Sequence, residues 1–145
     1  PKMEELYLAA NIVTSISGYE SMPSLKKLHL RKNKIDKIDD ELVPIDTLRY
    51  LNLRGNKIPN LEHVQKLFQF TAMTDLNVLR CPIEQNASSF NLLIAEILIL
   101  NPKMKRFSKT EITDVHRMEA VYLARFRWEK SEEERKKKED EERKK

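Results

Sequence analysis

Cysteine, glycine and long apolar runs are scarce in this sequence, and each shortage argues against a class of protein. Cys81 is the only cysteine, so no internal disulfide framework can form, which suits a reducing compartment. The two glycines, Gly18 and Gly55, cannot supply a P-loop or a G-x-G-x-x-G nucleotide-binding loop. The longest apolar stretch, Leu92–Leu100, is far shorter than the roughly 20 residues of a membrane-spanning helix and contains Glu96.

The net charge of +4 is unevenly distributed along the chain. Residues 129–145 contain eight acidic and eight basic residues, which cancel. The basic excess therefore lies in residues 1–128, as 19 basic against 15 acidic residues. A bias of this size does not by itself indicate nucleic-acid binding.

One motif recurs along the first half of the chain, in units that start at Met3, Leu25, Leu48 and Met73. The intervals are 22, 23 and 25 residues, and each unit follows L-x-x-L-x-L-x-x-N/C-x-I/V. The alternating L-x-L is a strand signal, and a period of this length is typical of leucine-rich repeats. The sequence thus predicts an α/β fold, a leucine-rich repeat solenoid in which short parallel strands line up into one curved sheet.

The positions within a unit have different physical roles. Leu28 and Leu30 flank His29 on a strand, so we expect both leucines to face the core and His29 to face the concave side. Asn33 and Asn56 follow the strands and can bond backbone groups of their own and neighbouring repeats in a ladder. Cys81 takes this place in the fourth unit. The connections through Pro23 and Pro44 favour short turns, whereas Val64, Leu67 and Phe68 have helical spacing.

Three parts are predicted along the chain. Residues 1–87 hold four repeats, in an array that we interpret as truncated at its N-terminus and so as a piece of a longer protein. Residues 88–112 form a cap, with a helix over Phe90–Leu100 begun by Ser88 or Ser89 and a partial fifth repeat around Met104 and Phe107. Residues 113–145 form a long charged helix with Thr113 as its N-cap.

This C-terminal helix carries an apolar stripe in its first half. The stripe consists of Val115, Met118, Tyr122 and Phe126, and we expect it to dock on the cap around Ile97 and Phe107 or on a partner protein. Beyond Trp128 the sequence offers only opposite charges at i,i+4 spacing, which predict a projecting helix, with a disordered tail as the alternative. A coiled-coil contact is a further expectation for this helix.

The candidate binding site is the concave face of the sheet. Its predicted protein-binding residues are Tyr7, Lys27, His29, Arg31, Tyr50, Asn52, Arg54 and Arg80. Tyrosine and arginine are common anchors of protein interfaces, so we expect an acidic protein segment in this groove. Phosphate contacts with bases stacked on tyrosine are the less favoured alternative. The histidines have no metal-ligand spacing, and no nucleophile with a base is apparent, so we expect no catalytic residue, metal, cofactor or small-molecule substrate.

The repeats also resemble a known family. The segments LYLAANIV (Leu6–Val13), LHLRKNKIDKI (Leu28–Ile38) and LRYLNLRGN (Leu48–Asn56) are similar to consecutive repeats of the 22-residue intracellular leucine-rich repeat subclass, and most of all to its radial spoke proteins. The resemblance covers Met3–Ile112 and departs from the family pattern at Cys81 and Ser108.

This resemblance implies a non-enzymatic structural adaptor without a cofactor, which binds other radial spoke proteins of the axoneme. The implied location is the cytoplasm and cytoskeleton of a cilium or flagellum, with no membrane partner. The alternative that the repeat subclass allows is a nuclear adaptor, in a ribonucleoprotein or as a phosphatase regulator.

Overall fold

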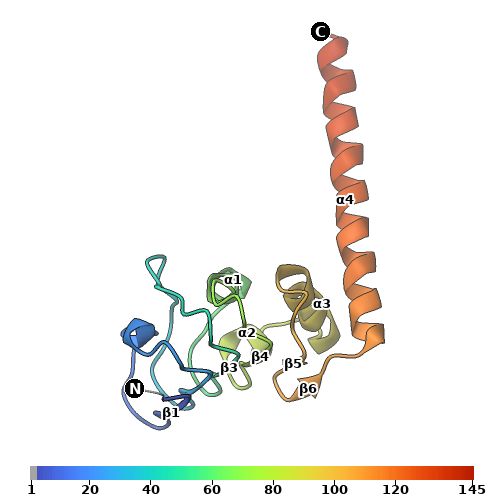
Figure 1. Cartoon of the computed structure of the whole chain (residues 1–145). Helices are drawn as coiled ribbons and strands as arrows, with labels where there is room; N and C mark the ends of the chain where they lie inside the picture. The colour runs from blue at the N-terminus through green and yellow to red at the C-terminus, as the bar shows by residue number, and fades with distance from the viewer. Residues whose placement is uncertain (1–2) are drawn as a thin grey trace.

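In the computed structural model, which describes residues 3–145, a single sheet of six strands runs through the repeats and the cap (Figure 1). The strands are β1 (Glu5–Tyr7), β2 (Lys27–His29), β3 (Tyr50–Asn52), β4 (Asp75–Asn77), β5 (Arg106–Phe107) and β6 (Thr110–Glu111). They pair in chain order, and β1 to β5 are parallel. The predicted leucine-rich repeat solenoid is confirmed, with β5 as the strand of the partial fifth repeat.

The register of the sheet aligns the apolar residue at the centre of each strand. Leu6 lies opposite Leu28, which is followed along the sheet by Leu51, Leu76 and Phe107. All of these side chains are fully buried except that of Leu6, which is partly buried. The second leucine of the L-x-L pairs, as in Leu30 and Leu53, is fully buried too. The core therefore runs continuously behind the sheet, as stacked repeats require.

Within residues 3–145, one 3₁₀ turn and four α-helices accompany the strands, and all but the last helix lie on the opposite side of the core from the concave face. They are the 3₁₀ turn η1 (Tyr19–Ser21) and the α-helices α1 (Leu61–Leu67), α2 (Pro82–Gln85), α3 (Phe90–Leu100) and α4 (Asp114–Arg143). The α1 helix buries Val64 and Leu67, as their spacing predicts. Ser89 caps α3 by accepting a hydrogen bond from the Leu92 N–H, as expected of one of the two candidate serines.

A ladder of polar side chains joins successive repeats. Asn33 and Asn56 are buried, and each bonds backbone groups of its own repeat and of the one before it. Cys81 continues the ladder by donating its S–H to the Leu53 carbonyl, and the Ser108 hydroxyl accepts from the Val78 N–H. Both departures from the repeat pattern therefore keep the hydrogen-bonding role of the residue they replace.

The α4 helix begins at the edge of the cap and extends well beyond the repeats (Figure 1). Thr113 caps it as predicted, in a reciprocal pair with His116. The first half packs on α3, and the rest is a single charged helix with ion pairs such as Arg135 with Glu132 and Glu139. The structure thus has an ordered helix where a disordered tail was the alternative.

The prediction that the apolar stripe of α4 docks on the cap is wrong. The exposed fractions of Val115, Met118, Tyr122 and Phe126 are 57%, 50%, 62% and 55%. The helix docks instead through Ala120, which is buried, and Leu123, which packs at the edge of the core. Arg117 donates to the carbonyls of Pro102 and Met104, and Arg127 pairs with Glu96. A small side chain lets the two helices approach closely, which a stripe of large residues would prevent.

Candidate functional site: the concave face of the sheet

Two rows of side chains project from the concave face because the strands are in register. The first row is Glu5, Lys27, Tyr50, Asp75 and Arg106, one residue from each parallel strand. The second row is Tyr7, His29, Asn52 and Asn77. The structure therefore brings together the concave strand residues that the sequence predicts: Tyr7, Lys27, His29, Tyr50 and Asn52.

Aromatic rings from three strands form one continuous surface. The Tyr7 and His29 rings stack with centroids 4.2 Å apart and an interplanar angle of 9°. The His29 and Tyr50 rings lie 4.9 Å apart and are tilted by 45°. Stacked rings of this kind are rigid, so these side chains would lose little conformational entropy when a partner binds.

Glu5 holds the aromatic surface at its outer end. Its Oε1 accepts a hydrogen bond of 2.8 Å from the Tyr7 hydroxyl, and the same oxygen lies 2.8 Å from His29 Nε2. These bonds, that of Tyr7 first and that of His29 second, lower the pKa of the Glu5 carboxyl. The same contact with Glu5 raises the pKa of Tyr7. Both rings are thereby fixed in orientation by a single carboxylate.

Basic residues surround the aromatic surface at both ends of the strands. Arg31 and Arg54 follow β2 and β3 at equal positions, and Arg80 follows β4 one position later. The strands and their flanking positions carry ten basic residues: Lys26, Lys27, Arg31, Lys32, Arg49, Arg54, Arg80, Lys105, Arg106 and Lys109. The same positions carry four acidic residues: Glu4, Glu5, Asp75 and Glu111. Because the whole chain has a net charge of only +4, this face is more basic than the rest of the molecule.

A small polar pocket lies on this face toward the cap. Its volume is about 190 Å³, and its lining is Tyr50, Asn52, Asp75, Asn77, Arg106 and Lys109. Burial raises the pKa of the Asp75 carboxyl, although Arg106 and then Lys27 oppose the shift. The sequence-based list omits Asp75, Arg106 and Lys109. The repeat register offered the signal, since Asp75 occupies the same position in its unit as Tyr50.

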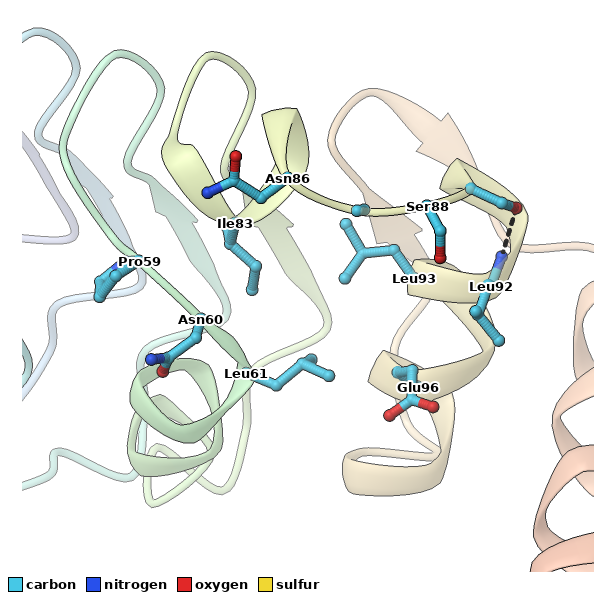
Figure 2. Close-up of a pocket in the computed structure, with 11 residues that line it drawn as sticks. Pro59, Asn60, Leu61, Ile83, Asn86, Ser88, Leu92, Leu93 and Glu96 are labelled. Atoms are coloured by element: carbon cyan, nitrogen blue, oxygen red, sulfur yellow. Dashed lines mark hydrogen bonds between the residues drawn. The ribbon is translucent and has the colours of Figure 1, made fainter.

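A second hollow, which is apolar, lies on the helical side of the solenoid (Figure 2). Leu61 of α1, Ile83 of α2 and Leu93 of α3 point into it, with Asn60, Asn86 and Glu96 around it (Figure 2). Its volume is about 310 Å³. It can hold an apolar side chain but contains no nucleophile next to a base.

The remaining histidines have structural partners. His63 Nδ1 accepts from the Ile38 N–H, and His116 Nδ1 accepts from the Thr113 N–H at the start of α4. Among residues 3–145, no group of histidine, cysteine and carboxylate side chains is placed to hold a metal ion. Within the same residues, no helix combines the length and apolar character needed to cross a membrane.

Comparison with known proteins agrees with this architecture. The family described as Leucine rich repeat matches residues 1–58. Human Leucine-rich repeat-containing protein 23 is 33% identical over 127 residues, which cover 87% of this chain and 36% of that protein. The Xenopus tropicalis protein of the same name is 31% identical over 121 residues, covering 83% of this chain and 33% of its own length. The chain therefore spans about a third of the length of these relatives.

Two further similarities, one in sequence and one in structure, are to proteins other than Leucine-rich repeat-containing protein 23. Acidic leucine-rich nuclear phosphoprotein 32 family member A of Drosophila melanogaster is 37% identical over 76 residues, 52% of this chain and 29% of that protein. A chain in the crystal structure of the Drosophila melanogaster SNF/U2A' complex superposes with a TM-score of 0.74 at 21% identity, covering 83% of this chain and 68% of that chain. This last likeness shows the fold alone.

No catalytic family is indicated by these matches, and the fold is one that presents a surface to protein partners. The stacked repeats, the ladder and the sequence matches lead to one assignment. The chain has the leucine-rich repeat fold and is similar over most of its length to Leucine-rich repeat-containing protein 23.

Proposed function

We propose that this chain is a non-enzymatic structural adaptor of the ciliary or flagellar axoneme, which binds neighbouring radial spoke proteins through its concave face. The observation that carries the proposal is the concave face itself, where Tyr7, His29 and Tyr50 form an aromatic surface between two basic margins. The similarity to Leucine-rich repeat-containing protein 23, together with the resemblance of the repeats to radial spoke proteins, supports the axonemal setting.

The physical character of this face favours an acidic protein segment as the ligand. Arginines at the strand ends can form bidentate ion pairs with carboxylates, and the flat aromatic surface can bury an apolar side chain between them. Complementary charge would also speed the encounter between the two proteins. The C-terminal helix adds a second element, because its charged half extends away from the repeats toward other parts of an assembly (Figure 1).

A nuclear adaptor is the second candidate. It is favoured by the 37% identity with acidic leucine-rich nuclear phosphoprotein 32 family member A, although that match covers 52% of the chain. The broader coverage of the matches to Leucine-rich repeat-containing protein 23 supports the axonemal proposal over this alternative.

Proximity labelling in ciliated cells tests the proposal. The protein is fused to a labelling enzyme, and the parent is compared with the double variant Arg31→Glu, Arg54→Glu. The control variant Lys37→Glu, Lys138→Glu makes the same change of charge outside the concave face. We expect radial spoke proteins to be labelled by the parent and the control and to be lost with the concave variant, because like charges would then face an acidic ligand.

Two other outcomes would contradict this proposal. Labelling dominated by nuclear ribonucleoproteins or phosphatases would support the nuclear candidate instead. Recovery of spoke proteins that is equal for both variants would place the interface away from the concave face. A salt titration separates protein from nucleic acid, because phosphate-dominated binding weakens linearly in log salt with a slope near the number of contacts.

A further inference from the structure

The first half of α4 exposes an unusual amount of apolar surface. Among residues 3–145, six of the twelve exposed large hydrophobic residues lie within this one stretch of helix. They are Val115, Met118, Val121, Tyr122, Phe126 and Trp128. Concentrated apolar surface of this kind on a folded chain usually marks an interaction site.

The stripe faces away from the rest of the molecule. Tyr122 is about 200° around the helix from Ala120, the residue that packs on α3, at about 100° per residue. Docking on the cap thus leaves the stripe of Val115, Met118, Tyr122 and Phe126 free along its whole length. Further along the same face the residues become Glu129, Glu133 and Lys136, so the apolar part is confined to the first half.

We propose that two copies of this chain pair through the first halves of their α4 helices in an antiparallel arrangement. Met118 of one copy then faces Tyr122 of the second copy, and Val115 faces Phe126. A two-fold axis makes each of these contacts twice, so a short stripe is enough to cover itself completely. The pairing does not depend on what binds the concave face.

The charged residues beside the stripe favour pairing with a second copy in the antiparallel orientation. Asp114 and Arg125 lie on the same flank of the stripe, and the antiparallel pairing places Asp114 of one copy beside Arg125 of the other. In a parallel pair, a residue of one copy lies close to the residue five positions later in the other copy. Asp114 would then approach Glu119, and Arg125 would approach Lys130, so like charges would repel in both places. A parallel pair would also align Glu129, Glu133 and Lys136 with their own copies. On the other flank of the antiparallel pair the two Glu119 side chains approach each other, which limits its strength.

The shape of the molecule permits this arrangement. The repeats and α3 lie on one side of α4, and the helix projects past them (Figure 1). The solenoids of two copies would therefore lie on opposite sides of the helix pair, and each charged half would extend past the stripe of its partner.

Sedimentation equilibrium of the 145-residue chain measures the association. We expect a dimer whose dissociation constant rises at least tenfold in the variant Tyr122→Ser, Phe126→Ser. The control Ile12→Ser, Leu92→Ser removes exposed apolar side chains that do not belong to the stripe and should leave the association unchanged. A parent chain that remains monomeric at high micromolar concentration overturns the proposal and leaves the stripe to a different protein.

Disulfide trapping determines the orientation, since Cys81 is the only native cysteine and is buried. In the antiparallel pair, Met118→Cys and Tyr122→Cys should cross-link when the two variants are mixed and much less when each is oxidised alone. Cross-linking of each variant with itself, without a product specific to the mixture, would show a parallel pair and contradict the proposal. Arg125→Glu gives an independent check, because it should weaken the antiparallel dimer and strengthen a parallel one.

Discussion

Asn56 joins two repeats by donating from Nδ2 to the carbonyl of Leu30, 2.8 Å away in the preceding unit, and to that of Leu53 at 3.0 Å in its own. Its Oδ1 accepts from the Ile35 N–H at 3.1 Å. The side chain is buried, so water cannot replace these partners. One amide therefore bonds three backbone groups that belong to two adjacent repeats.

Asn56→Ala should lower the free energy of unfolding by at least about 1–3 kcal/mol, the usual cost of a single unsatisfied buried polar group. Urea denaturation measures the loss. Asn11→Ala is the control, because Asn11 is exposed and its side chain bonds only the nearby carbonyls of Leu8 and Ala9. Similar losses for the two variants would show that the ladder contributes little to stability.

Leu51→Ala should destabilise the protein by about 2–5 kcal/mol, because it removes a fully buried side chain from the centre of the sheet and leaves a cavity. Thermal and urea unfolding would both report the change. Ile12→Ala, at a highly exposed position, should change stability by less than about 0.5 kcal/mol. A small loss at Leu51 would be incompatible with a core that runs continuously behind the strands.

The repeat architecture was predictable because each of its determinants is local. The spacing of Leu28 and Leu30 identifies a strand with one buried face, and the unit length then fixes how neighbouring strands align. Asn33 and Asn56 could be assigned to the ladder because their positions recur. The cap was predictable for a similar reason, since Ser89 begins a helix that Asn101 ends.

The docking face of α4 was not predictable in the same way. Hydrophobicity favours the stripe of large residues, whereas the contact with α3 depends on the small side chain of Ala120 and on the bonds from Arg117 to two carbonyls. Those carbonyls become acceptors only once the cap has folded. The polar pocket was not predictable for a similar reason, because strand pairing brings together Asp75 and Arg106, which are far apart in the sequence.

Asp75→Asn should stabilise the protein at neutral pH, because burial raises the pKa of the Asp75 carboxyl and the ionised form is therefore disfavoured in the folded state. Parent stability falls as pH rises from the ordinary pKa of an aspartate through the raised value. The advantage of the variant should be present above that window and vanish below it, where Asp75 is neutral in both states. Thermal unfolding of the two proteins between pH 3 and 7, at about 0.15 M salt, measures the difference. An advantage that is equal at all these pH values would have a cause other than the charge.

Ala120→Leu should separate the first half of α4 from α3, because Ala120 is buried in the contact between the two helices and a larger side chain there would push them apart; overpacking costs about 1–3 kcal/mol. Hydrogen exchange of the backbone amides between Arg117 and Leu123 should become faster. The variant Tyr122→Ser, Phe126→Ser is the matched control at protein concentrations low enough to keep the chain monomeric. These two side chains face solvent, so exchange in the control should match that of the parent. If exchange were faster in the control and unchanged by Ala120→Leu, the helix would dock through its apolar stripe and not through Ala120.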